Sequence, residues 1–189
     1  MLILLLGPSG VGKSSIAQHL VEQRGWLPLI SIITRAERTD EIFKVSISTR
    51  SYEMLASHRK LWSDVEQNGY RYGLLKNEVQ AAVEDPNHFY VVDFGLSSRN
   101  TYFSNVDHLV VYIAAESDAA LESRIIAAER PDRVAGALAT SKELDSWYES
   151  TGVREGAKKI INFDGLLTDV AAQVVSAANI WATQRQRSG

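Results

Sequence analysis

Cysteine is absent from this chain of 189 residues. The chain can therefore form no disulfide bond, thiolate nucleophile or cysteine-bound metal site, which fits a reducing cytosol. It also lacks long runs of lysine or arginine and has a formal net charge of -3, so we expect no binding to nucleic acid. No apolar stretch reaches the length of a membrane span, and the apolar start lacks the basic region of a signal peptide. We therefore expect a soluble, cytoplasmic protein that does not bind membranes.

The most specific signal lies in the first fifteen residues. Leu2–Leu6 is apolar and of strand length, and it runs directly into Gly7–Ser14, which fills every fixed position of the P-loop pattern. An amphipathic segment follows, so the pattern lies between a strand and a helix. Glycines let backbone N–H groups turn toward an anion, while Lys13 reaches the outer phosphates and the Ser14 hydroxyl binds Mg²⁺. The sequence therefore predicts ATP or GTP binding by Ser9, Gly10, Val11, Gly12, Lys13, Ser14 and Ser15.

Strand-like and helix-like segments alternate through most of the chain, and 45% of its residues are hydrophobic. This composition is enough for one packed core, and the alternation predicts an α/β fold with a parallel sheet. Asp93 ends one apolar strand, at the sheet edge where ligands collect in open α/β folds. Beyond the first strand and helix, we expect strands at 29–33, 89–93, 109–113 and 159–162, and helices from 76 to about 84 and at 119–128, 140–150 and 166–182.

Residues 39–73 depart from this alternation. One segment alternates apolar and polar residues with period two, which is typical of a half-exposed antiparallel strand. Ser51 is a candidate N-cap for a short helix, and Asn68-Gly69 is the strongest hairpin signal in the chain. The expected elements are a strand at Phe43–Ser48, a helix at Ser51–Lys60 and a hairpin of Leu61–Gln67 with Tyr70–Leu75.

Two arginines follow the second expected strand in Thr34-Arg35-Ala36-Glu37-Arg38. With the P-loop, this T-R-x-x-R segment resembles the guanylate kinase family of P-loop nucleoside monophosphate kinases. In that family the two arginines hold the acceptor phosphate, and two guanidinium groups three residues apart can clamp a dianionic phosphate. Gly69–Gly73, read as G-Y-R-Y-G, resembles the family's G-N-Y-Y-G segment. The resemblance implies acceptor binding by Ser31, Arg35, Arg38, Ser63, Tyr72 and Asp93.

The positions that read guanine in the family are altered in this chain. Counting back from Gly69, the family's guanine-reading glutamate corresponds to Ser63, and the serine after Y-G corresponds to Leu74. Asp64 or Glu66 supplies a carboxylate only if the register slips, and a one-residue slip points the side chain to the opposite face of the strand. The phosphate clamp is therefore retained, whereas the identity of the acceptor stays open.

Asp93 and Asn162 have counterparts in two other family segments. Asp93 resembles one acid of the L-D-x-D strand, which helps to organise magnesium and the acceptor base, whereas Gly95 replaces the other acid. Asn162 ends a segment that resembles the family's I-V-N near adenine. The resemblance thus implies Ser14 and Asp93 as magnesium ligands and Asn162 as a contact of the donor base.

A short arginine-rich segment, Glu129–Arg133, resembles the LID of these kinases. Arg124 and Arg130 align with the family's R-L-x-x-R, and a later family arginine falls near Ala137, so we expect Arg133 to take its place. Guanidinium groups that close over the phosphates neutralise transition-state charge and exclude water. The implied catalytic residues are Lys13, Arg124, Arg130 and Arg133.

The resemblance implies a P-loop NTPase three-layer fold with a parallel sheet, in one domain of residues 1–189. Its core covers about 1–31, 74–128 and 140–189, with a mostly β acceptor-binding insertion at about 32–73 and a short LID at about 129–139. The implied reaction moves the γ-phosphoryl group of ATP, with Mg²⁺, to the phosphate of a small acceptor, GMP or dGMP, on a monomer or homodimer. Two alternatives stay open: a kinase similar to ribose 1,5-bisphosphate phosphokinase, with Ser98-Arg99 as a compatible contact, and an inactive binding module.

Overall fold

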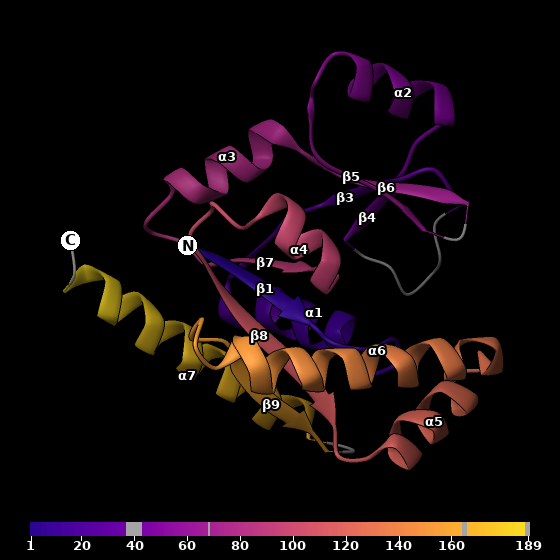
Figure 1. Ribbon diagram of the computed structural model, residues 1–189. Helices are drawn as coiled ribbons and strands as arrows, with labels where there is room; N and C mark the ends of the chain where they lie inside the picture. Colours follow the sequence, from indigo (N-terminus) through magenta and orange to yellow (C-terminus); the bar gives the residue numbers. More distant parts are fainter. Residues whose placement is uncertain (37–42, 68, 164–165, 188–189) are drawn as a thin grey trace.

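A parallel sheet forms the centre of the computed structural model, which describes residues 1–36, 43–67, 69–163 and 166–187 (Figure 1). Its strands are β1 Leu2–Leu6, β2 Leu27–Pro28, β7 Tyr90–Asp93, β8 His108–Ala115 and β9 Lys158–Asn162. They lie in the order β2-β7-β1-β8-β9, and each neighbouring pair is parallel. The predicted α/β fold with a parallel sheet is confirmed.

Helices cover both faces of this sheet. The helices are α1 Lys13–Arg24, α3 Lys76–Glu84, α4 Leu96–Tyr102, α5 Asp118–Ala127, α6 Val134–Trp147 and α7 Leu167–Gln186. Side chains of β1 alternate between the faces: Ile3 and Leu5 pack with residues of α1, α5 and α7, and Leu2 and Leu4 pack with residues of α3. Burial on both faces explains why β1 is a continuous apolar run.

A second sheet and one helix form a lobe at the top of Figure 1. Its elements are β3 Ser31–Ile33, β4 Lys44–Ser46, α2 Thr49–Ser57, β5 Leu61–Gln67 and β6 Tyr70–Leu75. The strand order is β4-β3-β6-β5, with β3 antiparallel to β6, and β6 antiparallel to β5. The predicted hairpin of β5 and β6 therefore forms with the expected bounds.

Three local predictions in this lobe are wrong. The strand expected at 29–33 begins only at Ser31, as β3 of the second sheet, whereas β2, which was not expected, ends at Pro28 in the first sheet. β4 lies parallel to β3, although we expected an antiparallel strand. The prediction failed because alternating polarity indicates which face of a strand is buried and says nothing about strand direction. α2 begins at Thr49, because the Ser48 hydroxyl caps it by accepting the Ser51 N–H at 3.0 Å.

The helix expected at 140–150 also differs, since α6 already begins at Val134. A 3₁₀ turn at Pro131–Arg133 leads into α6, and a π-helix at Tyr148–Gly152 follows it. Proline is favoured in a first helical turn because its missing N–H has no partner there. On α3, Val79 and Ala82 are buried, whereas Val83 is 43% exposed. Among the described residues, no helix is both long and apolar enough to cross a membrane.

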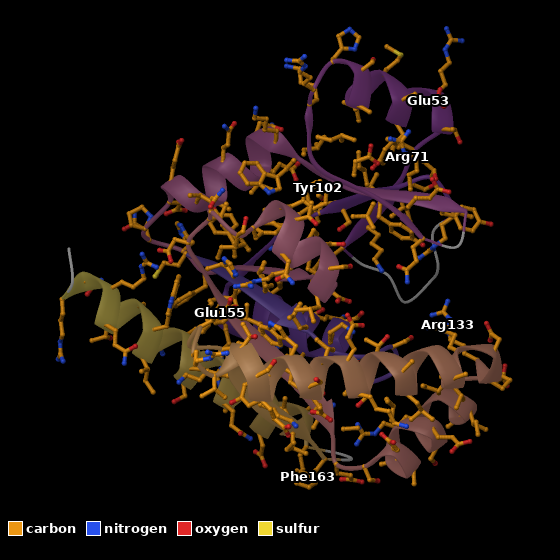
Figure 2. The ribbon with its side chains drawn as sticks, in the orientation of Figure 1. Glu53, Arg71, Tyr102, Arg133, Glu155 and Phe163 are labelled. Atoms are coloured by element: carbon orange, nitrogen blue, oxygen red, sulfur yellow. The ribbon has the colours of Figure 1, made fainter. Side chains whose placement is uncertain are left out.

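The two faces of the second sheet have different surroundings. On the outer face, Tyr52 of α2 donates a hydrogen bond from its hydroxyl to Asp64 Oδ1 at 3.0 Å. Arg71 donates from Nε to the same oxygen at 3.1 Å and also pairs with Asp64 Oδ2, while its guanidinium carbon lies 4.6 Å from the centre of the Tyr52 ring. Figure 2 shows Arg71 between the sheet and α2. This cluster fastens α2 to the outer face and leaves the inner face toward the parallel sheet.

Contacts between α4 and β5 join the lobe to the rest of the chain. Trp62 donates from Nε1 to the Tyr102 carbonyl at 3.1 Å, and the Tyr102 hydroxyl donates to the Asp64 carbonyl at 2.6 Å. Leu74 of β6 is buried with Leu2 and other residues of the parallel-sheet core. The inner face of the second sheet therefore packs directly against the layer that carries the P-loop.

Candidate active site

The P-loop connects the end of β1 with the start of α1. Gly10 and Gly12 have φ angles of +81° and +95°, in the left-handed region that favours glycine. A Cβ at Gly10 would lie 2.5 Å from Ile125 Cγ1, and one at Gly12 would lie 2.8 Å from Asn162 Nδ2. Both positions therefore require glycine for conformation and for space. Free N–H groups at the start of α1 suit this turn to phosphate binding.

Lys13 and Asp93 lie together at the C-terminal ends of the central strands. Lys13 donates from Nζ to the carbonyls of Gly7 and Pro8, at 2.8 and 2.9 Å. Its Nζ is 3.7 Å from Asp93 Oδ1, because β1 and β7 pair with Leu5 beside Asp93. These carbonyls hold the ammonium group over the loop whose N–H groups would bind phosphate.

Ser14 and Asp93 line one pocket with residues of both sheets. A hydroxyl and a carboxylate are the oxygen ligands that Mg²⁺ prefers, with water and phosphate oxygens completing its octahedron. The residues present therefore fit a magnesium ion. The remaining lining residues are Ala17, Leu29, Ser31, Phe43, Lys44, Val91 and Val92.

Asn162 braces the P-loop from the end of β9. Its Nδ2 donates to the Val11 carbonyl at 2.7 Å, and its own carbonyl accepts from Arg124 Nη2 at 2.8 Å. The side chain of Asn162 thus fixes the loop that is predicted to bind the phosphates, a role that the sequence did not suggest. The same contacts hold Arg124 of α5 beside the P-loop.

Arg130 and Arg133 flank the 3₁₀ turn between α5 and α6, and the Arg133 N–H donates to the Arg130 carbonyl at 3.0 Å. Figure 2 shows Arg133 projecting from the start of α6 toward the second sheet. The two arginines are half-buried and lie in a short segment between two helices. This placement suits side chains that close over a bound nucleotide.

Arg35 and Tyr72 meet on the second sheet. Arg35 is only 9% exposed and donates from Nε to the Tyr72 hydroxyl at 3.2 Å, and from Nη1 to the Ala36 carbonyl at 2.9 Å. The Ser46 hydroxyl donates to the Arg35 carbonyl at 2.8 Å, which fixes the backbone of this arginine. A buried, oriented guanidinium beside a phenol can bind a phosphate. Arg38, its expected partner, lies outside the described residues.

The Ser63 hydroxyl is buried within the β5–β6 hairpin and is not placed to bind a base. Ser63 is 2% exposed, and its Oγ accepts the N–H of Leu74 at 3.1 Å across the hairpin. Asp64 lies on the outer face with Tyr52 and Arg71, so the register slip considered above does not occur. The Asp64 carboxylate therefore does not lie on the inner face of the second sheet.

Arg99, the candidate contact for a sugar phosphate, is bound to other side chains of the protein. It donates from Nε to His108 Nε2 at 3.0 Å and forms an ion pair with Glu155 at 2.9 Å. Burial lowers the pKa of His108, which favours the neutral ring that accepts this hydrogen bond. Arg99 thus anchors α4 to β8, while Figure 2 shows Glu155 below α4 and near β8.

The sequence model described as "Guanylate kinase" matches residues 1–149. The chain belongs to the guanylate kinase family. The guanylate kinase of Rhizobium meliloti (strain 1021) is 29% identical over 160 residues, which cover 79% of this chain and 72% of the relative. That of Bacillus subtilis (strain 168) is 30% identical over 134 residues, which cover 67% of this chain and 64% of the relative.

A solved structure supports the same fold for this guanylate kinase family member. The crystal structure of guanylate kinase from Anaplasma phagocytophilum superimposes with a TM-score of 0.70, covering 97% of this chain and 85% of that chain at 17% identity. The likeness extends beyond the 149 residues that the sequence model matches. As a guanylate kinase family member, this chain is an ATP-dependent phosphotransferase that acts on small nucleotide substrates.

Sequence reasoning did not single out Lys44, which lines the pocket of this guanylate kinase family member. No motif contains it, and on the sequence it is one polar residue of an alternating strand. Only its pairing with Ser31 of β3 reveals its place beside a predicted site residue. If the pairing of these strands had been known, the position of Lys44 next to Ser31 would have indicated a site residue.

Proposed function

We propose that this protein transfers the γ-phosphoryl group of Mg-ATP to the phosphate of GMP. The observation that carries the proposal is a pocket that Ser14 of the P-loop helix and Asp93 of β7 share with Ser31 of the second sheet. The P-loop supplies the donor side, and Arg35 with Tyr72 supplies a phosphate-binding pair on the acceptor side. The guanylate kinase names of the relatives indicate GMP as the acceptor.

Transfer between two phosphates needs little covalent chemistry from the protein. An oxygen of the acceptor phosphate attacks the γ-phosphorus in line, so the residues must position two phosphates and neutralise their charge. Lys13 would exchange its carbonyl partners for phosphate oxygens, and Arg124, Arg130 and Arg133 would surround the transferred group. Mg²⁺, held through Ser14 and Asp93, would screen the phosphate charge. A monomeric or homodimeric state and a cytoplasmic location remain predictions.

The sugar-phosphate alternative gains no support from its candidate contact, because Arg99 is engaged with His108 and Glu155. The inactive-module alternative conflicts with an intact P-loop in which Lys13 lies beside Asp93. Among the residues that the structure describes, neither alternative has an observation in its favour.

A coupled assay of ADP release with GMP tests the proposal. We expect turnover with the wild type and its loss in Lys13→Ala, because the ammonium group contacts the transferred phosphates. Lys158→Ala, at an exposed position of β9, is the control and should keep full activity. Turnover of Lys13→Ala close to that of the control would refute the mechanism.

A further inference from the structure

The inner face of the second sheet presents two rows of side chains to the pocket layer. One row contains Tyr72 of β6, beside Ile33 of β3, and holds Arg35. The other row lies two residues further along each strand, which is about 7 Å away. Strand register defines its members across the four strands as Lys44, Ser31, Leu74 and Ser63.

The spacing of the rows matches the two ends of a nucleoside monophosphate. If the phosphate is bound at Arg35 and Tyr72, the base extends over the second row. In that row Leu74 is apolar and 1% exposed, and Ser63 is 2% exposed with its Oγ bound to the Leu74 N–H, so neither side chain lines the pocket. Ser31 and Lys44 are half-buried and line the pocket. Polar recognition from this row therefore comes from the β3–β4 side.

We propose that Lys44 is a specificity-determining residue. Its ammonium group donates hydrogen bonds to acceptor atoms of the substrate's base. This inference rests on the proposed GMP kinase function. An ammonium group only donates hydrogen bonds, and guanine presents two acceptors on one edge, O6 and N7. Lys44 binds this edge, together with the Ser31 hydroxyl, and the 2-amino group of guanine is not read by the second row.

Three purine monophosphates distinguish this mode of recognition from a carboxylate reader. Hypoxanthine keeps O6 and N7 but lacks the 2-amino group, so IMP should be phosphorylated with a kcat/KM within about fivefold of that for GMP. Adenine carries an amino group in place of O6. This amino group and the Lys44 ammonium are both hydrogen-bond donors, so they cannot bind each other. AMP should therefore be a poor acceptor.

The test compares Lys44→Met with the wild type for GMP, IMP and AMP in the coupled assay, and calorimetry measures GMP binding without turnover. Removal of a charged hydrogen-bond donor should raise KM for GMP and IMP about 10- to 100-fold with kcat nearly unchanged, and should reduce discrimination against AMP. Lys44→Arg keeps a cation and should retain part of the discrimination. Lys60→Met, an exposed lysine of the same lobe, is the control.

Each outcome bears on a different statement. Unchanged KM and unchanged AMP discrimination in folded Lys44→Met overturn the assignment of Lys44 and leave the proposed function standing. A wild type that prefers GMP to IMP by 100-fold or more also overturns it, because the 2-amino group is then read. A wild type that neither binds nor phosphorylates GMP overturns both proposals.

Discussion

Asp64 offers a sharp test of how the second sheet divides its two faces. The Tyr52 ring is completely buried, and Asp64 is the acceptor of its hydroxyl proton. Replacing Asp64 with alanine leaves this hydroxyl without its partner, which costs about 1–3 kcal/mol. The ion pair with Arg71 is about one-third exposed on both sides and adds only about 0.2–1 kcal/mol. We expect Asp64→Ala to lower the free energy of unfolding by about 2–3 kcal/mol.

The same variant should keep its affinity for the acceptor, because Asp64 faces α2 and not the pocket. The assay is chemical unfolding followed by fluorescence, combined with KM for GMP at a temperature where the variant stays folded. Asp64→Asn keeps an oxygen for Tyr52 and should recover much of the lost stability. If KM for GMP instead rises tenfold or more while stability is unchanged, Asp64 reads the base and the assignment of faces is refuted.

Three further predictions concern the two ends of the site and the core. Tyr72→Phe removes the hydroxyl that orients Arg35, so KM for GMP should rise about tenfold with the fold intact, and an unchanged KM would contradict the phosphate clamp. Asn162→Ala removes the brace on the P-loop and should raise KM for ATP about fivefold, while KM for GMP stays constant as the internal control. Burial, followed by carboxylate neighbours, raises the pKa of Tyr52 and of Tyr112. Since the unfolded chain then loses protons first, stability should be constant near neutral pH and fall above about pH 10, and alkaline denaturation curves of the two Tyr→Phe variants should show less of this fall.

Local signals were reliable where a short pattern is tied to one backbone conformation. The P-loop forms the predicted turn between β1 and α1, because Gly10 and Gly12 adopt conformations that other residues avoid. The hairpin of β5 and β6 has its expected bounds because Asn68-Gly69 favours a tight turn. Asp93 lies beside Lys13 because parallel strands end at a common edge.

The predictions that were wrong concern partners distant in sequence. We expected one strand at 29–33 because apolar residues are compatible with either sheet, but Leu29 and Ile30 lie between β2 and β3, where the chain changes sheets. Likewise, the alternation in β4 could not distinguish parallel from antiparallel pairing. Arg99 was compatible with a phosphate contact in an alternative that stayed open, and its pairing with the distant His108 and Glu155 could not be known from the sequence.

The sequence by itself predicted the donor side of this protein, because the eight contiguous residues of Gly7–Ser14 contain the glycines and side chains that are typical of triphosphate binding. It also indicated the phosphate end of the acceptor through Arg35 and Tyr72. Only the tertiary structure decided which side chains lie on the inner face of the second sheet, and the proposed role of Lys44 rests on that face. Strand pairing places Lys44 next to Ser31, commits Ser63 to a backbone hydrogen bond and turns Asp64 to the outer face. Those contacts join four strands, and no local pattern in the chain encodes them.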